Sequence, residues 1–118
     1  TSVSVVAQQL FANSRNVAEF QPEEFEDRIL KSSTKRVWLV DCYAHWCGHC
    51  KHFAPVWERV AKKFENDDRV RFGAINCAKH SSFCGKLGVK SYPSLRAYNF
   101  PSLIPKGAGE LKGASIEK

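Results

Sequence analysis

The chain has 118 residues, of which 43% are apolar and 25% are charged. This composition fits one folded domain and excludes disorder caused by a charge-rich, apolar-poor sequence. The net charge is +6, but the basic residues are scattered, so we expect solvated surface and no nucleic-acid partner. The longest clean apolar run, residues 37–40, is far shorter than the roughly 18 residues of a membrane-spanning helix.

Residues 1–16 are predicted to form an N-terminal extension with a short helix, and residues 17–118 a single domain. The helical stripe in the extension comprises Val5, Val6, Leu10 and Phe11. At the start of the domain, residues 17–20 favour a short edge strand. Pro22, followed by two glutamates, is typical of the first turn of a helix, which we expect over residues 22–31.

A nearly continuous apolar run of seven residues, 37–43, interrupted only by Asp41, predicts a central strand covered on both faces. A Cys-Gly-His-Cys motif follows at residues 47–50, and an amphipathic helix extends from it to about Glu65. The apolar face of this helix comprises Phe53, Val56, Trp57, Val60, Ala61 and Phe64. The motif is therefore expected between a buried strand and the start of a helix.

The remaining elements continue an alternation of strands and helices. Strands are predicted over residues 70–76 and 94–98, with a short helix over residues 81–87 between them. A last strand is expected near residues 110–114. This order predicts an α/β domain whose mixed central sheet carries helices on both faces.

The Cys-Gly-His-Cys motif places two thiols three residues apart on one face of a helix, close enough to form a disulfide. Cys47 would lie at the helix N-terminus, where unpaired backbone N–H groups and the helix dipole stabilise a thiolate. His49 would add polarity or positive charge beside that sulfur. Because a stabilised thiolate stabilises the reduced form, the Cys47–Cys50 disulfide is expected to be oxidising.

The chain contains five cysteines, so at least one thiol has no disulfide partner within it. A Cys-x-x-Cys motif is also half of a zinc site, but the other cysteines and the histidines supply no second ligand pair at suitable spacing. We therefore expect redox chemistry and no metal. Cys42 is expected to be a buried, inert side chain, and His45, His52 and His80 are expected at the surface.

Residues 43–51, Tyr-Ala-His-Trp-Cys-Gly-His-Cys-Lys, with Pro55 eight residues after Cys47, resemble the active site of protein disulfide isomerase domains in the thioredoxin superfamily. Residues 90–94, Lys-Ser-Tyr-Pro-Ser, resemble the cis-proline loop of the same superfamily. A narrower resemblance depends on Cys77 and Cys84. They are similar to the extra cysteine pair in the N-terminal thioredoxin domain of quiescin-sulfhydryl oxidases.

The resemblance implies a thioredoxin fold in which Cys47 is the exposed nucleophile and Cys50 the buried resolving thiol. Asp41 matches the buried acid of the family, which could exchange a proton with Cys50. The alternative for Asp41 is a carboxylate that reaches water at the end of its strand. Many members carry a lysine opposite this acid, whereas this chain has Ala74 there, which predicts a still higher pKa for Asp41.

The resemblance also makes Pro93 the cis-proline that faces the two sulfurs, with Tyr92 and Trp46 positioned to bind a substrate peptide. For Trp46, packing against the active-site loop is an equal alternative. The narrower resemblance implies a structural Cys77–Cys84 disulfide. Such a disulfide fits an oxidising compartment: the endoplasmic reticulum, the Golgi or the secreted space. Family members usually end with a helix, so the short C-terminal tail indicates that this helix is missing and that the chain is a piece of a longer protein.

We predict a thiol–disulfide oxidoreductase that oxidises dithiols of substrate proteins through Cys47 and Cys50. The sequence has no dinucleotide-binding fingerprint, so no cofactor is expected in the chain itself. The narrower resemblance implies that electrons pass to an FAD-bearing sulfhydryl oxidase domain, tethered downstream or separate. Two rival hypotheses use the same residues: a protein disulfide isomerase or reductase module, and a peptide-binding, chaperone-like domain in which redox chemistry is secondary.

Overall fold

The computed structural model describes residues 9–32 and 36–99. Within them, one sheet has the strand order β1-β3-β2-β4. Its strands are β1 (Val17–Phe20), β2 (Val37–Tyr43), β3 (Val70–Asn76) and β4 (Ser94–Tyr98). The first three strands are parallel and β4 is antiparallel to β2, so the sheet is mixed, as predicted. The strand expected near residues 110–114 and the C-terminal tail lie outside the described residues.

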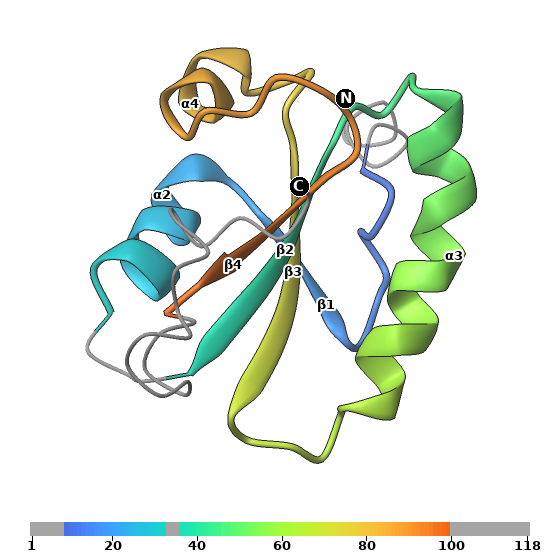
Figure 1. Cartoon of the computed structure of the whole chain (residues 1–118), viewed down its shortest axis with the longest axis vertical. Helices are drawn as coiled ribbons and strands as arrows, with labels where there is room; N and C mark the ends of the chain where they lie inside the picture. Colours follow the sequence, from blue (N-terminus) through green and yellow to red (C-terminus); the bar gives the residue numbers. More distant parts are fainter. Residues whose placement is uncertain (1–8, 33–35, 100–118) are drawn as a thin grey trace, which may run out of the picture.

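Helices cover both faces of this sheet (Figure 1). One face packs against α3 (Gly48–Lys63), which begins within the Cys-Gly-His-Cys motif. The opposite face carries α2 (Pro22–Phe25), the π-helical turn η1 (Glu26–Leu30) and α4 (Ser81–Lys86). The helix expected over residues 22–31 is thus an α-helical turn continued by a π-helical one. No helix in the described part of the chain is long and apolar enough to cross a membrane.

The alternation of side chains along β2 separates two cores. Val40 and Cys42 face α2 and α4 and join a core that also includes Trp38. Tyr43 faces α3 and joins the core that contains Cys50. Asp41, between Val40 and Cys42, shares the α3 side with Tyr43. One strand therefore supplies an apolar wall on one side and polar groups beneath the motif on the other.

The segment before β1 differs from its prediction. Residues 10–13 form a turn, not a helix, and residues 1–8 lie outside the described chain. Phe11 is fully buried, and its ring meets the Tyr43 ring edge-on, with 5.8 Å between the centroids. Phe11, which was expected on a helix face, instead packs into the core beneath α3, next to β1.

Candidate active site

The Cys-Gly-His-Cys motif lies between β2 and α3, as predicted. Cys47 is the N-cap residue of α3, with an extended backbone (φ −83°, ψ 125°), so the helical N–H groups begin directly after its sulfur. Its side chain is half-buried, whereas Cys50, one helical turn further, is fully buried. The two thiols therefore share one turn of helix but differ in their access to solvent.

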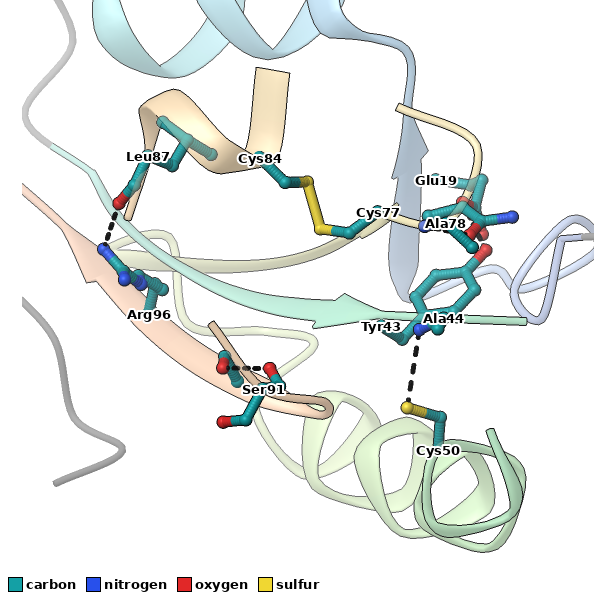
Figure 2. The surroundings of a disulfide bond; sticks show 12 residues. Glu19, Tyr43, Ala44, Cys50, Cys77, Ala78, Cys84, Leu87, Ser91 and Arg96 are labelled. Carbon is teal, nitrogen blue, oxygen red and sulfur yellow. Dashed lines mark hydrogen bonds between the residues drawn. A yellow bond between two sulfur atoms is a disulfide. The ribbon is translucent and has the colours of Figure 1, made fainter. Parts of the chain in front are cut away.

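The pKa values of the two thiols also differ: the more exposed thiol, Cys47, is the more acidic one. The backbone N–H of Cys50, the Cys50 thiol and the backbone N–H of His49 all stabilise the Cys47 thiolate, and together they lower the pKa of Cys47. Burial raises the pKa of Cys50 to about 12, although the Ala44 N–H donates to its sulfur over 3.5 Å (Figure 2). His49 thus acts on Cys47 through its backbone. Its imidazole, which we expected to supply polarity or charge, is exposed.

Asp41 lies inside β2, two residues before its end, and is fully buried, so the alternative of a carboxylate in water is wrong. Neither carboxyl oxygen forms a hydrogen bond with another described residue. Burial, followed by the charge of Glu19, raises the pKa of Asp41 to about 7. The strand register places Ala74 opposite Asp41, as the sequence comparison implied. The charge of Asp41 in turn raises the pKa of Cys50.

The loop before β4 closes the site on its other side. The peptide bond between Tyr92 and Pro93 is cis, and the Tyr92 carbonyl oxygen lies 4.0 Å from the Cys47 sulfur. The Tyr92 ring meets the Trp46 ring edge-on, with 6.1 Å between the centroids. Trp46 nevertheless remains 62% exposed. Trp46 therefore packs against the loop and still exposes a large aromatic surface beside Cys47.

The second cysteine pair lies on the other side of the sheet. Cys77 and Cys84 form a buried disulfide that joins the residue after β3 to α4 (Figure 2). Both sulfurs belong to the apolar core that also contains Cys42. The sheet therefore separates this disulfide from Cys47 and Cys50. In the described part of the chain, no group of three or more metal-binding side chains is arranged to hold an ion.

One functional candidate, Glu19, was not predicted from the sequence. Glu19, in edge strand β1, accepts hydrogen bonds from the Tyr43 hydroxyl over 2.7 Å and from the Phe11 N–H over 3.2 Å. Burial raises the pKa of Glu19 to about 7, despite these two bonds. A signal in the sequence could have indicated that Glu19 is buried. Glu19 lies two residues after Val17, so the two side chains share one face of the strand, and Val17 is buried.

Among the remaining histidines, the expectation of a surface position is correct only for His52. His45 and His80 are half-buried. The Nδ1 atom of His45 lies 2.9 Å from the side-chain nitrogen Nδ2 of Asn76, the last residue of β3. This contact ties the loop before Cys47 to the neighbouring strand, which places His45 among the residues that fix the loop's position.

The thioredoxin family profile matches residues 16–118. The chain belongs to the thioredoxin family. It is 36% identical over 89 residues to mouse protein disulfide-isomerase A6, covering 75% of this chain and 19% of that protein. It is 39% identical over 97 residues to protein disulfide isomerase-like 2-1 of rice, covering 80% of this chain and 24% of that protein.

Similarity to solved structures agrees with this assignment. The crystal structure of the Trx4 domain of ERdj5 superposes with a TM-score of 0.64 at 36% identity, covering 70% of this chain and 69% of that one. The chain spans only about a fifth of the full length of the protein disulfide isomerases it matches. It is thus similar to one thioredoxin domain of proteins that are several times longer.

Proposed function

We propose that this domain catalyses thiol–disulfide exchange on substrate proteins, as a module of the protein disulfide isomerase kind. The observation that carries the proposal is the contrast between two thiols on one helical turn. Cys47 is accessible and its pKa is lowered, whereas Cys50 is buried and its pKa is raised to about 12. Near neutral pH, Cys47 is therefore the nucleophile and Cys50 stays protonated until it is needed.

In the oxidising direction, a substrate thiolate attacks the Cys47 sulfur of the Cys47–Cys50 disulfide. A substrate–Cys47 disulfide forms, and Cys50 leaves as a thiolate that takes up a proton. A second substrate thiolate then attacks the substrate sulfur of this mixed disulfide and releases the Cys47 thiolate. The substrate loses two electrons, which the Cys47/Cys50 dithiol holds. The reverse sequence reduces a substrate disulfide. If a disulfide then forms between a different pair of substrate cysteines, the substrate has been isomerised.

Two assays on the same substrate protein test this proposal. One starts from the reduced substrate in a glutathione redox buffer, and the other starts from a form with mispaired disulfides. We expect the domain to accelerate both conversions. A Cys50→Ser variant lacks the resolving thiol, so it should accumulate the substrate–Cys47 disulfide, which non-reducing electrophoresis detects. A domain that accelerates neither conversion would contradict the proposal.

A second candidate is a relay in which this domain passes its electrons to a flavin-dependent sulfhydryl oxidase domain, tethered or separate. The observation that favours it is the Cys77–Cys84 disulfide, because that cysteine pair carried the narrower resemblance. An oxygen electrode separates the two candidates. The relay predicts that this chain alone consumes no oxygen with a dithiol substrate. Adding a flavin-bearing sulfhydryl oxidase should then start an uptake that requires Cys47. An isomerase module should leave the added oxidase's own rate unchanged.

The same disulfide supports the location. A buried disulfide outside the redox motif favours an oxidising compartment such as the secretory pathway. We also propose that the exposed Trp46 ring and the Tyr92 carbonyl form the contact surface for substrate peptide. A chaperone-like domain would bind peptide through this surface even without thiols. Binding that is unchanged in the Cys47→Ser, Cys50→Ser double variant would favour that hypothesis, and weakened binding would favour the redox module.

A further inference from the structure

Three strands bring two carboxyl groups into one row beneath α3. The register pairs Glu19 of β1 with Ala74 of β3, and Ala74 with Asp41 of β2. Neighbouring strands lie about 4.8 Å apart, so two strand spacings, about 10 Å, separate the backbones of the two acids. Paired residues point to the same face of a sheet, so the small Ala74 side chain lies between the two acids. A larger or charged side chain at residue 74 would separate the two carboxyl groups.

Glu19 is fixed in this position by its neighbours. The Tyr43 hydroxyl donates to one carboxyl oxygen over 2.7 Å, and the Phe11 N–H donates to the other over 3.2 Å. The Tyr43 hydroxyl itself accepts a bond from the Leu10 N–H over 3.1 Å. Figure 2 shows the Tyr43 ring extending from β2 toward Glu19. The turn over residues 10–13 thus covers this end of the row and holds the glutamate against β2.

The groups around the pair leave its charge uncompensated. Burial is the main cause that raises the pKa of each acid to about 7, and the charge of Glu19 raises the pKa of Asp41 further. From β2 and α3, the titratable groups that interact with the pair are Tyr43 and Cys50. β3 and β4 place Ala74 and Leu95 beside Asp41, and neither titrates. Within the described residues, no cation contributes to either pKa.

We propose that Glu19 is a positioning residue for thiol exchange, which acts through Asp41: the two buried acids carry one proton between them, and it stays on Asp41 while the Cys47–Cys50 bond is closed. This inference depends on the proposed function. When the Cys47–Cys50 bond opens, Asp41 gives its proton to the Cys50 thiolate, and the pair is left fully ionised. When the bond closes, the Cys50 thiol returns that proton to Asp41. The electrons move only between sulfurs, so no further oxidant or reductant is required.

Carbon-detected NMR titration of the two carboxyl groups in the oxidised protein, in which Asp41 still holds the proton, tests the coupling without measuring activity. In the unaltered chain, we expect both groups to titrate in two shared steps near neutral pH. Glu19→Gln removes the charge and keeps an acceptor oxygen for one of the two hydrogen bonds, because the side-chain nitrogen of glutamine only donates. Asp41 should then titrate in one step, lower by on the order of one pH unit. Tyr43→Phe removes a bond that stabilises the Glu19 carboxylate, so the Glu19 pKa should rise.

Glu65→Gln is the matched control, because Glu65 is an exposed acid just beyond the end of α3. It should leave both titrations unchanged. If Asp41 titrates identically in folded Glu19→Gln and in the unaltered chain, the proposal is overturned. The same holds if both acids are already ionised at about pH 5, because Asp41 would then have no proton to give to the Cys50 thiolate near neutral pH.

A kinetic measurement separates this proposal from a purely structural role for Glu19. The pH dependence of thiol exchange should shift to lower pH in Glu19→Gln by the amount by which the Asp41 titration shifts, with KM unchanged. If the profile does not move, Glu19 only anchors the turn at Phe11, and the proposal is wrong while the proposed function stands. If the unaltered chain performs no exchange at any pH, both the proposed function and this role of Glu19 are wrong.

Discussion

The two faces of the sheet bury different chemistry. On the side of α2 and α4, the core is apolar and its Cys77–Cys84 pair is closed in a disulfide. On the side of α3, the core contains two thiols, at Cys47 and Cys50, above a buried carboxyl group, Asp41. The alternation of β2 produces this division. One face therefore mainly stabilises the domain. The other contains buried ionisable groups, which destabilise the fold but provide reactivity.

The largest difference between the two faces should appear in activity, when one cysteine on each face is replaced. Cys47→Ser replaces a thiolate by a hydroxyl that stays protonated, so we expect the rate of disulfide exchange to fall by about a hundredfold or more. Cys42→Ala, in the opposite core, is the matched control and should keep most of the activity. Oxidation of a reduced peptide measures both. Comparable losses in the two variants would abolish the proposed difference between the faces.

Next in size is the pH dependence of stability. Burial raises the Asp41 pKa from 3.8 to about 7, so the folded state binds this proton more tightly than the unfolded state. The free energy of unfolding should therefore fall as pH rises from about 4 to about 7. Asp41→Asn removes this loss and should stabilise the domain by roughly 2–4 kcal/mol at pH 8, but little at pH 4.

Urea denaturation at the two pH values measures this effect. Asp27→Asn provides the control, because Asp27 is an exposed acid on the π-helical turn. It should change stability by less than about 0.5 kcal/mol at either pH. A gain in Asp41→Asn that is equal at pH 4 and pH 8 would show that the effect comes from packing and not from the buried charge.

The disulfide face should respond in stability alone. Replacing Cys77 and Cys84 by serine opens a short loop, which should lower the free energy of unfolding by about 2–3 kcal/mol at any pH from 5 to 8. The alkylation rate of Cys47 should not change, because the sheet lies between the two pairs. Thermal unfolding and alkylation together test this. A folded variant with altered Cys47 reactivity would place the disulfide within the active site.

The smallest effect on stability is expected at Trp46, which is 62% exposed. Trp46→Ala should change the free energy of unfolding by no more than about 0.5 kcal/mol. It should nevertheless raise KM for a peptide substrate about two- to tenfold, through loss of an aromatic contact. Phe64→Ala is the control, because Phe64 is an exposed aromatic residue at the far end of α3. Equal KM values for the two variants would remove Trp46 from the substrate surface.

Strong local patterns predicted most of this arrangement. The near-continuous apolar run before the motif predicted β2, and Cys42 is buried as expected. Glu19 was missed because an acid in an edge strand usually faces water. Only the register across three strands places it beside Asp41. Phe11 was assigned to a helix because of the apolar stripe at residues 5, 6, 10 and 11, but such a stripe does not reveal whether Phe11 fills a helix face or caps a distant core.

The most direct test of the account is alkylation of the fully reduced chain at increasing pH, with each cysteine followed by mass spectrometry. The account predicts that Cys47 is labelled first, already at about pH 6, because the start of α3 stabilises its thiolate. Cys50 should remain almost unlabelled throughout, because it is buried and its pKa is raised to about 12. Equal labelling of the two, or labelling of Cys47 only above about pH 8, where an ordinary thiol ionises, would contradict it.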